Sequence, residues 1–221
     1  MVVFLTYLSC RRHRGQKNKK QKLTVYGVVE DQQEFVQCLK EIYQSKENNI
    51  HVDLKNSEGG KPDRIVGFAI KECQRHRSFA WLDEDFEPAD PLSDDVRIEL
   101  AKLWKVESEN LKDFLSCPLR DLQVTYNPNN KKPVVIISQP VCSESVIIQA
   151  LGETIPDSCK VYNPDPLQRD KQIKGLKDKL NKIAGKSDRI NFYRKNLNKV
   201  TLEERRKLIP ELDLLISMIT K

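Results

Sequence analysis

The amino-acid sequence predicts an α/β fold in which a mostly parallel sheet is flanked by helices and followed by a helical, basic C-terminal region. Between residues 22 and 152, apolar runs of strand length alternate with stretches that have the apolar period of a helix. This β-α-β-α-β order is typical of a parallel sheet with helices packed on it. We therefore expect an α/β domain over residues 22–152, a disordered basic segment at 1–21, and a helical extension at 153–221 that packs on the domain.

The first three strands and two helices follow from the hydrophobic pattern. Residues 23–30 form an apolar run, and the next dozen residues carry a helical apolar stripe. Residues 50–54 alternate as a short strand. A glycine turn then leads into a helix beginning at Pro62, because proline is favoured in the first helical turn. Residues 79–85 form the third strand, which ends in acidic side chains.

The second half of the domain is predicted to add further helices and one more strand. A helix is expected over residues 93–104, where the first serine can act as its N-cap, and a second amphipathic segment over 111–115. Residues 133–138 read as a buried strand. A helix over 144–151 should then end at Gly152.

The C-terminal region is predicted to be helical from about residue 166. Thr201 and Glu204 have the spacing of a capping box, which would start a final helix through residues 208–219. Pro210 should kink or split that helix, because proline cannot donate the backbone hydrogen bond that a helix interior requires.

The net charge of +6 is distributed unevenly along the chain. Residues 11–22 carry seven basic side chains and no acid, and residues 160–221 carry 16 basic against 8 acidic side chains. Residues 23–159 are acidic, with 15 basic against 24 acidic side chains. An acidic centre between basic flanks suits a metal-dependent enzyme that acts on a polyanion such as nucleic acid.

Five basic residues are candidates for nucleic-acid contacts. Lys61 and Arg64 flank the start of the second helix, where backbone N–H groups also favour anions. Lys174, Lys177 and Arg194 occupy polar positions of the predicted tail helices. For any one of these side chains taken alone, a solvated helix face is the simpler interpretation.

Neither the N-terminus nor the cysteines suggest export or membrane insertion. The apolar stretch Met1–Cys10 is shorter than the roughly 20 residues that span a bilayer. The basic residues follow this stretch, whereas a signal peptide places them before it. The six cysteines form no CxxC pair, which favours free thiols in a reducing compartment. We therefore expect a cytoplasmic protein with no membrane association.

Acidic residues at the ends of two predicted strands suggest a metal site. Asp83 and Asp85 share one face of their strand because side chains alternate, and Glu30 ends the first strand. If the strands are parallel, these three carboxylates meet at the carboxyl edge of the sheet, where ligands bind in α/β folds. Clustered carboxylates repel one another unless a cation holds them, and oxygen ligands suit Mg²⁺, or Mn²⁺ in its place. Each residue taken alone could instead be a turn former or a helix cap.

Other common sites are not indicated. The chain has no Walker A motif and no GxGxxG fingerprint, so an intrinsic ATPase or a Rossmann dehydrogenase is not expected. Its three histidines, His13, His51 and His76, lack the spacing of a metal-binding set.

The acidic pattern resembles the Toprim domain of topoisomerases, primases and OLD-type nucleases, and is most similar to small bacterial RloB-like proteins. The run Glu30–Glu34 resembles that family's Glu-Gly-x-x-Glu segment, with Asp31 in place of glycine. Gly59–Val66 resembles its glycine-rich turn, and Asp83–Asp85 its Asp-x-Asp motif. The segment Ser138–Glu144 is similar to a further family motif with one extra residue, which makes Glu144 a fourth candidate metal ligand.

The resemblance implies a Toprim-type nuclease that cleaves nucleic-acid phosphodiesters with Mg²⁺, of the kind encoded with anti-phage or restriction systems. Glu30, Asp83 and Asp85 would be its catalytic and metal-binding carboxylates, with Glu30 relaying a proton. A second interpretation is a non-catalytic Toprim scaffold that binds nucleic acid or a partner ATPase, which the replacement of glycine by Asp31 favours. A third is a flavodoxin-like domain with a phosphorylated aspartate, because fold alone does not establish a reaction.

Overall fold

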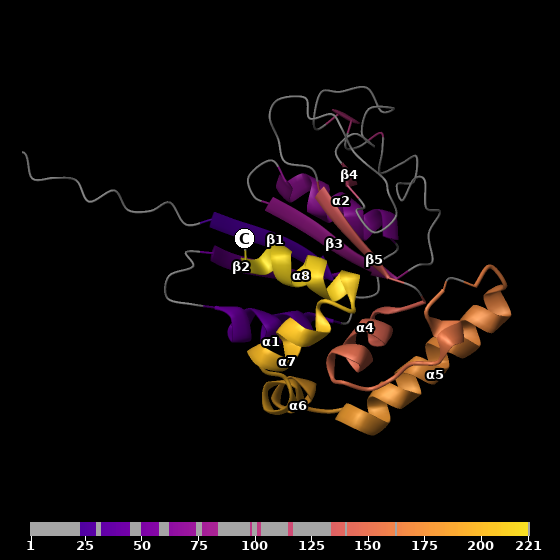
Figure 1. Ribbon diagram of the computed structural model, residues 1–221. Coiled ribbons are helices and arrows are strands. Elements are labelled where there is room, and N and C mark those ends of the chain that lie inside the picture. The colour runs from indigo at the N-terminus through magenta and orange to yellow at the C-terminus, as the bar shows by residue number, and fades with distance from the viewer. Residues whose placement is uncertain are drawn as a thin grey trace, which may run out of the picture.

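A computed structural model of the chain describes the sheet, the helices around it and the whole C-terminal region (Figure 1). The residues described are 23–29, 32–44, 50–57, 62–73, 77–83, 98, 101–102, 115–116, 134–139, 141–161 and 163–220. The predicted segment 1–21 and nearly all of the helix predicted over 93–104 lie outside these ranges.

Over the described ranges the sheet has five strands in the order β2-β1-β3-β5-β4, and all the neighbouring pairs are parallel. The strands are β1 (Leu23–Val29), β2 (Ile50–Asn56), β3 (Arg77–Asp83), β4 (Leu115–Ser116) and β5 (Val134–Gln139). The predicted α/β class and parallel sheet are therefore confirmed. The prediction of a helical segment through Leu115 is wrong, because Leu115 pairs with Val134 at the edge of the sheet.

The helices follow the predicted alternation with the strands. They are α1 (Gln33–Tyr43), α2 (Pro62–Cys73), α4 (Ser143–Ala150), the 3₁₀ helix η3 (Asp157–Cys159), α5 (Pro166–Ala184), α6 (Arg189–Asn196), α7 (Lys199–Arg205) and α8 (Pro210–Thr220). From β1 the chain moves to β2 on one side of β1, and from β2 it crosses back over β1 to β3 on the other side. Since such crossovers are right-handed, α1 and α2 lie on opposite faces of the sheet.

Both faces of the sheet are covered. Helix α2 contacts β1, β3 and β5, whereas α8 contacts β2 and β5 and packs beside α1 (Figure 1). The central strand β3 is buried from Ser78 to Leu82, as expected for a parallel strand with helices on both sides. Gly27 on β1 is paired with Phe79 on β3, and a Cβ at this glycine would overlap the phenylalanine ring.

Three aromatic rings connect the sheet to the C-terminal region. The ring of Phe35 on α1 lies 6.1 Å from that of Trp81 on β3 and 5.6 Å from that of Tyr193 on α6, in an edge-to-face arrangement with the tyrosine. All three side chains are buried. Because buried aromatic pairs are strong packing contacts, the helical extension shares one hydrophobic core with the α/β domain.

Helix ends in the C-terminal region agree only in part with the sequence pattern. Pro210 separates α7 from α8 and is the first residue of α8, as predicted. The capping box predicted at Thr201 is wrong, because the N-cap of α7 is Asn198, whose side-chain oxygen accepts from the Thr201 N–H at 3.0 Å. Asparagine is an equally good N-cap, and it comes three residues earlier.

The carboxyl end of α4 is held by a side chain from α7. Gly152 has a φ of +90°, which ends the helix as predicted, and the Arg205 guanidinium donates to the Ala150 carbonyl. A Cβ at Gly152 would lie against the same guanidinium group. A cation at a helix carboxyl end is favourable because the exposed carbonyls carry negative partial charge.

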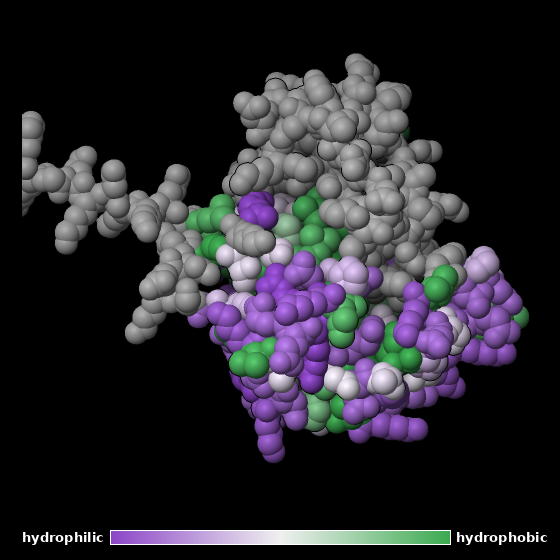
Figure 2. Space-filling view, in the orientation of Figure 1, coloured by the Kyte–Doolittle hydropathy of each residue, from purple (hydrophilic) through white to green (hydrophobic). Residues whose placement is uncertain are grey.

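The face shown in Figure 2 is mainly hydrophilic over the C-terminal helices, with isolated hydrophobic patches between the polar side chains. Among the helices that the structure describes, none combines the length and the apolar character needed to cross a lipid bilayer.

An ion pair joins the first helix of the sheet domain to the C-terminal region. The Arg194 guanidinium on α6 donates from two nitrogens to the Glu41 carboxylate on α1, each at 2.7 Å. The hydrogen bond from Arg194 is the main reason that the pKa of Glu41 falls from 4.5 to about 2. A carboxyl group with a lowered pKa stabilises the fold above its unfolded pKa and loses this contribution as the pH falls.

We predict that Glu41→Gln lowers the free energy of unfolding at pH 7 by about 1 kcal/mol or less, because exposed ion pairs are weak. The difference from the parent chain should disappear as the pH is lowered from about 5 toward the folded pKa of about 2. Urea unfolding at a series of pH values measures it, with Glu204→Gln on the exposed side of α7 as the control. A difference that does not change with pH would show that the ion pair contributes nothing.

Candidate functional site

The candidate site lies where the strand order reverses. The chain leaves β1 toward β2 on one side, and leaves β3 toward β4 and then β5 on the other, so a crevice is expected between the carboxyl ends of β1 and β3. The register pairs Val28 with Ala80, and Asp83 with Gln139 on β5. Asp83, the last residue of β3, therefore lies at this edge of the sheet.

The carboxylate of Asp83 is bonded to the start of α4. Its Oδ1 accepts from the Ser143 N–H at 2.9 Å. The N-cap residue of α4, Cys142, has no side-chain hydrogen bond of its own to the helix. Asp83 thus satisfies one of the free N–H groups at the helix N-terminus, and its negative charge faces the positive end of the helix dipole.

The turn between β5 and α4 is strained. Val141 is fully buried and has a φ of +67°, a conformation that is unusual for a β-branched residue. Such backbone conformations cost on the order of 1–3 kcal/mol and persist only where the surrounding structure holds them. Here the strained turn places Cys142, Ser143 and Glu144 at the carboxyl edge of the sheet.

A second hydrogen bond joins the N-terminal ends of α1 and α4. The Gln32 side chain, at the N-cap of α1, donates from Nε2 to the Ser143 hydroxyl. Both residues are buried. Ser143 therefore contacts β3 through its backbone and α1 through its side chain, which fixes three elements around the site.

Glu144 carries a buried carboxylate in the first turn of α4. Its residue is only 9% exposed, and its Oε2 has no hydrogen-bond partner among the described residues. Burial raises the pKa of the neighbouring Cys142 thiol, and the charges of Glu144 and Asp83 raise it further. Both carboxylates thus act on the same thiol, so the site concentrates negative charge in a region with little solvent.

A small cavity of about 10 Å³ adjoins Glu144. Besides Glu144, its lining includes Glu34 from α1 and both Arg189 and Tyr193 from α6. Burial raises the pKa of Tyr193 to about 12, the Arg189 charge lowers it, and the charges of Glu34 and Glu144 raise it. A volume of this size is comparable to that needed by one water molecule.

The structure brings together two of the four predicted acidic residues. Asp83 and Glu144 meet around the start of α4, whereas Glu30 and Asp85 lie outside the described residues, so their predicted approach to Asp83 is untested. Within the described ranges, no group of three or more His, Cys, Asp and Glu side chains has an arrangement that could hold a metal ion. Asp83 and Glu144 therefore form an incomplete ligand set on their own.

The predicted basic contacts have different environments. Lys61 lies outside the described residues, and Arg64 is exposed with its guanidinium 5.5 Å from the centre of the Phe68 ring. Lys174 and Lys177 are exposed on α5. Arg194 is engaged with Glu41, so a phosphate would have to compete with that carboxylate.

Sequence reasoning missed Gln32, Ser143, Arg189 and Tyr193 as parts of this site. Gln32 and Ser143 fall within segments already singled out, Glu30–Glu34 and Ser138–Glu144, but neither has a charge that would have marked it. Only the fold places Arg189 and Tyr193 there, because α6 begins 39 residues after the end of α4 and nothing in the local pattern indicates its partner.

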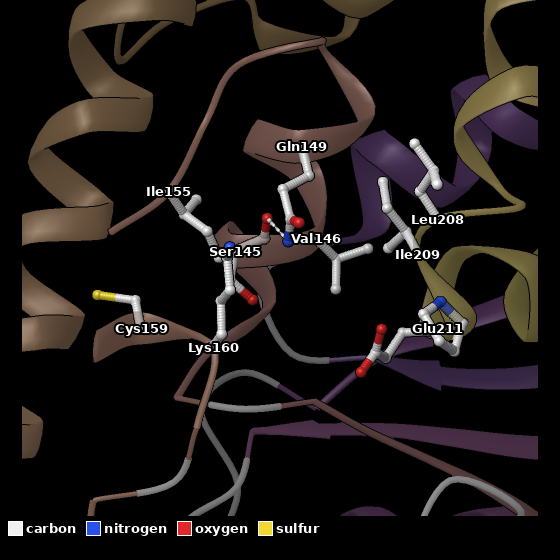
Figure 3. A pocket seen from close by; sticks show the side chains of 10 residues that line it. Ser145, Val146, Gln149, Ile155, Cys159, Lys160, Leu208, Ile209 and Glu211 are labelled. Atoms are coloured by element: carbon white, nitrogen blue, oxygen red, sulfur yellow. Dashed lines mark hydrogen bonds between the residues drawn. The ribbon is translucent and has the colours of Figure 1, made fainter. Parts of the chain in front are cut away.

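A larger hollow lies on another side of α4. It has a volume of about 170 Å³, and Figure 3 shows Ser145 and Gln149 of α4 facing it together with Ile209 and Glu211 from the start of α8. Gln149 donates to the Ser145 carbonyl at 3.0 Å, so part of its polar lining is already paired within the helix. Its lining mixes aliphatic side chains with polar and charged ones, and Asp83 and Glu144 do not line it.

We predict that Asp83→Ala lowers the free energy of unfolding by about 1–2 kcal/mol, because it removes the acceptor for a helix N-terminal N–H group. Asp83→Asn retains an oxygen at the same position and should cost less than half as much. Urea unfolding compares the two, with Asp170→Ala on the exposed surface of α5 as the control. Equal effects of Asp83→Ala and Asp83→Asn would mean that the charge, and not the hydrogen bond, stabilises α4.

Comparison with known proteins adds no relative to this description. The resemblance to Toprim domains therefore stays a prediction, and what the site does has to be inferred from its own residues. No family model, no curated protein sequence and no solved structure matches the chain.

Proposed function

We propose that the chain is a Mg²⁺-dependent phosphodiesterase that cleaves nucleic acid, with Asp83 and Glu144 among its metal ligands. The observation that supports this most is the buried Glu144 carboxylate, whose Oε2 lacks a partner within the described residues, beside Asp83 at the strand-order reversal. A buried carboxylate oxygen without a donor is costly, and a hard cation is the partner that suits it. On this proposal, Glu30 and Asp85 complete the ligand set.

The oxygen ligands available fit Mg²⁺ or Mn²⁺ better than a softer metal. The Cys142 thiol is fully buried, and burial together with the charges of Glu144 and Asp83 raises its pKa, so it remains protonated at neutral pH. When bound, Mg²⁺ would neutralise charge on the scissile phosphate and activate a water molecule. The chain's own contribution is to hold Asp83 through Ser143 and to position the first turn of α4 through Gln32.

The basic C-terminal helices support a polyanionic substrate. Residues 160–221 carry twice as many basic as acidic side chains, and Lys174 and Lys177 are exposed on α5. We infer that they attract nucleic acid through its phosphates. Three buried cysteines that stay free thiols, Cys38, Cys142 and Cys159, support a reducing, cytoplasmic compartment. We infer that the setting there is defence against foreign nucleic acid.

A second candidate is a non-catalytic scaffold that binds nucleic acid or a partner ATPase. The hydrogen bond from Ser143 to Asp83 favours it, because an aspartate that serves as a helix cap has a sufficient structural role without any metal. The two candidates differ in what they require of Glu144. Only the enzyme needs a carboxylate there.

We predict that Glu144→Gln lowers the affinity for Mn²⁺ at least tenfold and raises the melting temperature of the metal-free protein, because the substitution removes a buried charge near Asp83. Calorimetric titration and thermal unfolding, each with and without Mn²⁺, measure the two effects, and a nuclease assay on labelled DNA and RNA measures activity. Glu153→Gln, on the exposed segment after α4, is the matched control. Unchanged Mn²⁺ binding in Glu144→Gln would exclude the proposed ligand.

We predict that nucleic-acid affinity falls steeply with salt and that Lys174→Glu combined with Lys177→Glu weakens it further. Each phosphate contact on duplex DNA contributes about 0.9 to the slope of log affinity against log salt concentration. The double variant should therefore have a slope smaller by about two, measured by fluorescence anisotropy. Lys207→Glu, in the turn before α8, makes one such charge reversal elsewhere and serves as the control for each single substitution. Affinity that does not depend on salt would instead favour a protein partner.

A further inference from the structure

The strand β2 forms one edge of the sheet (Figure 1). Among the described strands, none lies beyond it, so the backbone groups on its outer side pair with no described strand. The inner side is identified by Ser57, directly after β2, whose N–H donates to the Val29 carbonyl on β1 at 2.8 Å. Since backbone groups alternate in direction along a strand, the outward groups belong to residues 50, 52, 54 and 56.

A lysine of α1 agrees with this direction. The Val52 carbonyl, which the alternation directs outward, accepts from the Lys40 ammonium at 3.1 Å. A carbonyl oxygen has two lone pairs, so this bond leaves room for a second donor. The side chains of Ile50 and Leu54 pack against the core and remain partly exposed. The outer edge of β2 therefore has backbone groups and apolar side chains that a further strand could cover.

The other face of β2 carries charges in a defined order. Asp53 is exposed and forms no ion pair with a described residue. Lys55 shares this face because side chains alternate along a strand, and its ammonium lies 3.4 Å from the centre of the Phe68 ring on α2. Charged side chains often prevent edge strands from pairing. An acid and a base two residues apart, however, can pair with each other across an antiparallel strand.

Charge restricts how two β2 strands could pair around a two-fold axis. An axis at Asp53 would place the two aspartates opposite each other, and an axis at Lys55 would do the same for the two lysines. An axis at Val52 would leave Lys55 opposite residue 49, which precedes the strand. An axis at Leu54 places Asp53 of each copy opposite Lys55 of the other, so this register replaces repulsion by two ion pairs.

The same register suits the backbone. It places Leu54 opposite Leu54, and Val52 opposite Asn56, and all of these residues have outward backbone groups. They therefore become the hydrogen-bonded pairs of an antiparallel ladder. Asp53 and Lys55 then occupy the non-hydrogen-bonded positions, where side chains on neighbouring strands are closest. Charge and hydrogen-bond direction thus favour one register independently of each other.

We propose that two copies of the chain pair through β2, antiparallel about a two-fold axis at Leu54, and so join their sheets into one. Each copy contributes one Asp53 and one Lys55 to two equivalent ion pairs, and the same surface serves both copies, as in most homodimers. The interface uses neither Asp83 nor Glu144. It is therefore independent of the proposed phosphodiesterase activity.

Sedimentation velocity of the full chain tests the dimer at concentrations from about 1 to about 200 μM, where a small interface associates. Asp53→Lys and Lys55→Asp should each weaken association at least about tenfold, because both ion pairs become repulsive. The double variant, Asp53→Lys with Lys55→Asp, should restore it by rebuilding the pairs with opposite sign. Asp178→Lys on the exposed side of α5 is the matched control. Thermal unfolding checks that Lys55→Asp, which loses the contact with Phe68, stays folded.

Disulfide trapping tests the register. Two Leu54 residues opposite each other have Cα atoms about 5.5 Å apart, within the range that a disulfide spans. Leu54→Cys should therefore form a covalent dimer under mild oxidation, whereas the parent chain should not. His51→Cys is the control on the same strand, because the two copies of residue 51 would be about 20 Å apart.

Three results would overturn the proposal. The first is a chain that stays monomeric at the highest concentration. The second is a dimer that the single substitutions at Asp53 and Lys55 leave unchanged, or that the double variant fails to restore, since its interface would lie elsewhere. The third is trapping through His51→Cys in preference to Leu54→Cys, which would exclude the register.

Discussion

The hydrogen bond from the Ser143 N–H to the Asp83 carboxylate is the contact on which the arrangement of the site depends. It joins the end of the central strand to the start of a buried helix, and the Ser143 hydroxyl extends the connection to Gln32 at the start of α1. The strained backbone at Val141 lies two residues before this serine, and such a conformation persists only where the surrounding structure holds it. Three elements that are far apart in the sequence thus meet at one serine.

The two carboxylates at this edge are not equivalent. Asp83 already has a donor, and its charge is favourable beside the N-terminus of α4. Glu144 has a buried oxygen without a described partner, although it lies in the first turn of α4. The Asp83 carboxylate therefore stabilises the fold, whereas burying the Glu144 carboxylate costs free energy. This difference is the physical basis for proposing a function for Glu144.

The fold class could be predicted from the sequence because the apolar runs are long and regularly spaced. The strands β1, β2, β3 and β5 all begin within two residues of their predicted starts. Pro210 begins α8, and Gly152 follows the end of α4, as is common for proline and glycine at helix ends. The α7 N-cap was misassigned to Thr201, since several polar residues competed for it within one turn.

The candidate site could be predicted only where charge coincided with a strand end, as at Asp83. The environment of Glu144 depends on the strained turn at Val141, which no residue pattern indicates because valine is disfavoured in that conformation. Arg189 and Tyr193 reach the site through tertiary packing of α6, and such contacts leave no periodic signal in the sequence. The acidic residues Glu30 and Asp85 remain predictions.

The position of α8 on the sheet determines when the core can close. This helix covers β2 and β5 and lies beside α1, although about 160 residues separate it from β2. Contacts between segments so far apart raise the contact order of the fold, and loop closure must precede them. The part of the sheet face that α8 covers, beside α1, therefore stays exposed during synthesis until α8 has been made. Apolar strand surface exposed in this way is prone to aggregation until that helix packs on it.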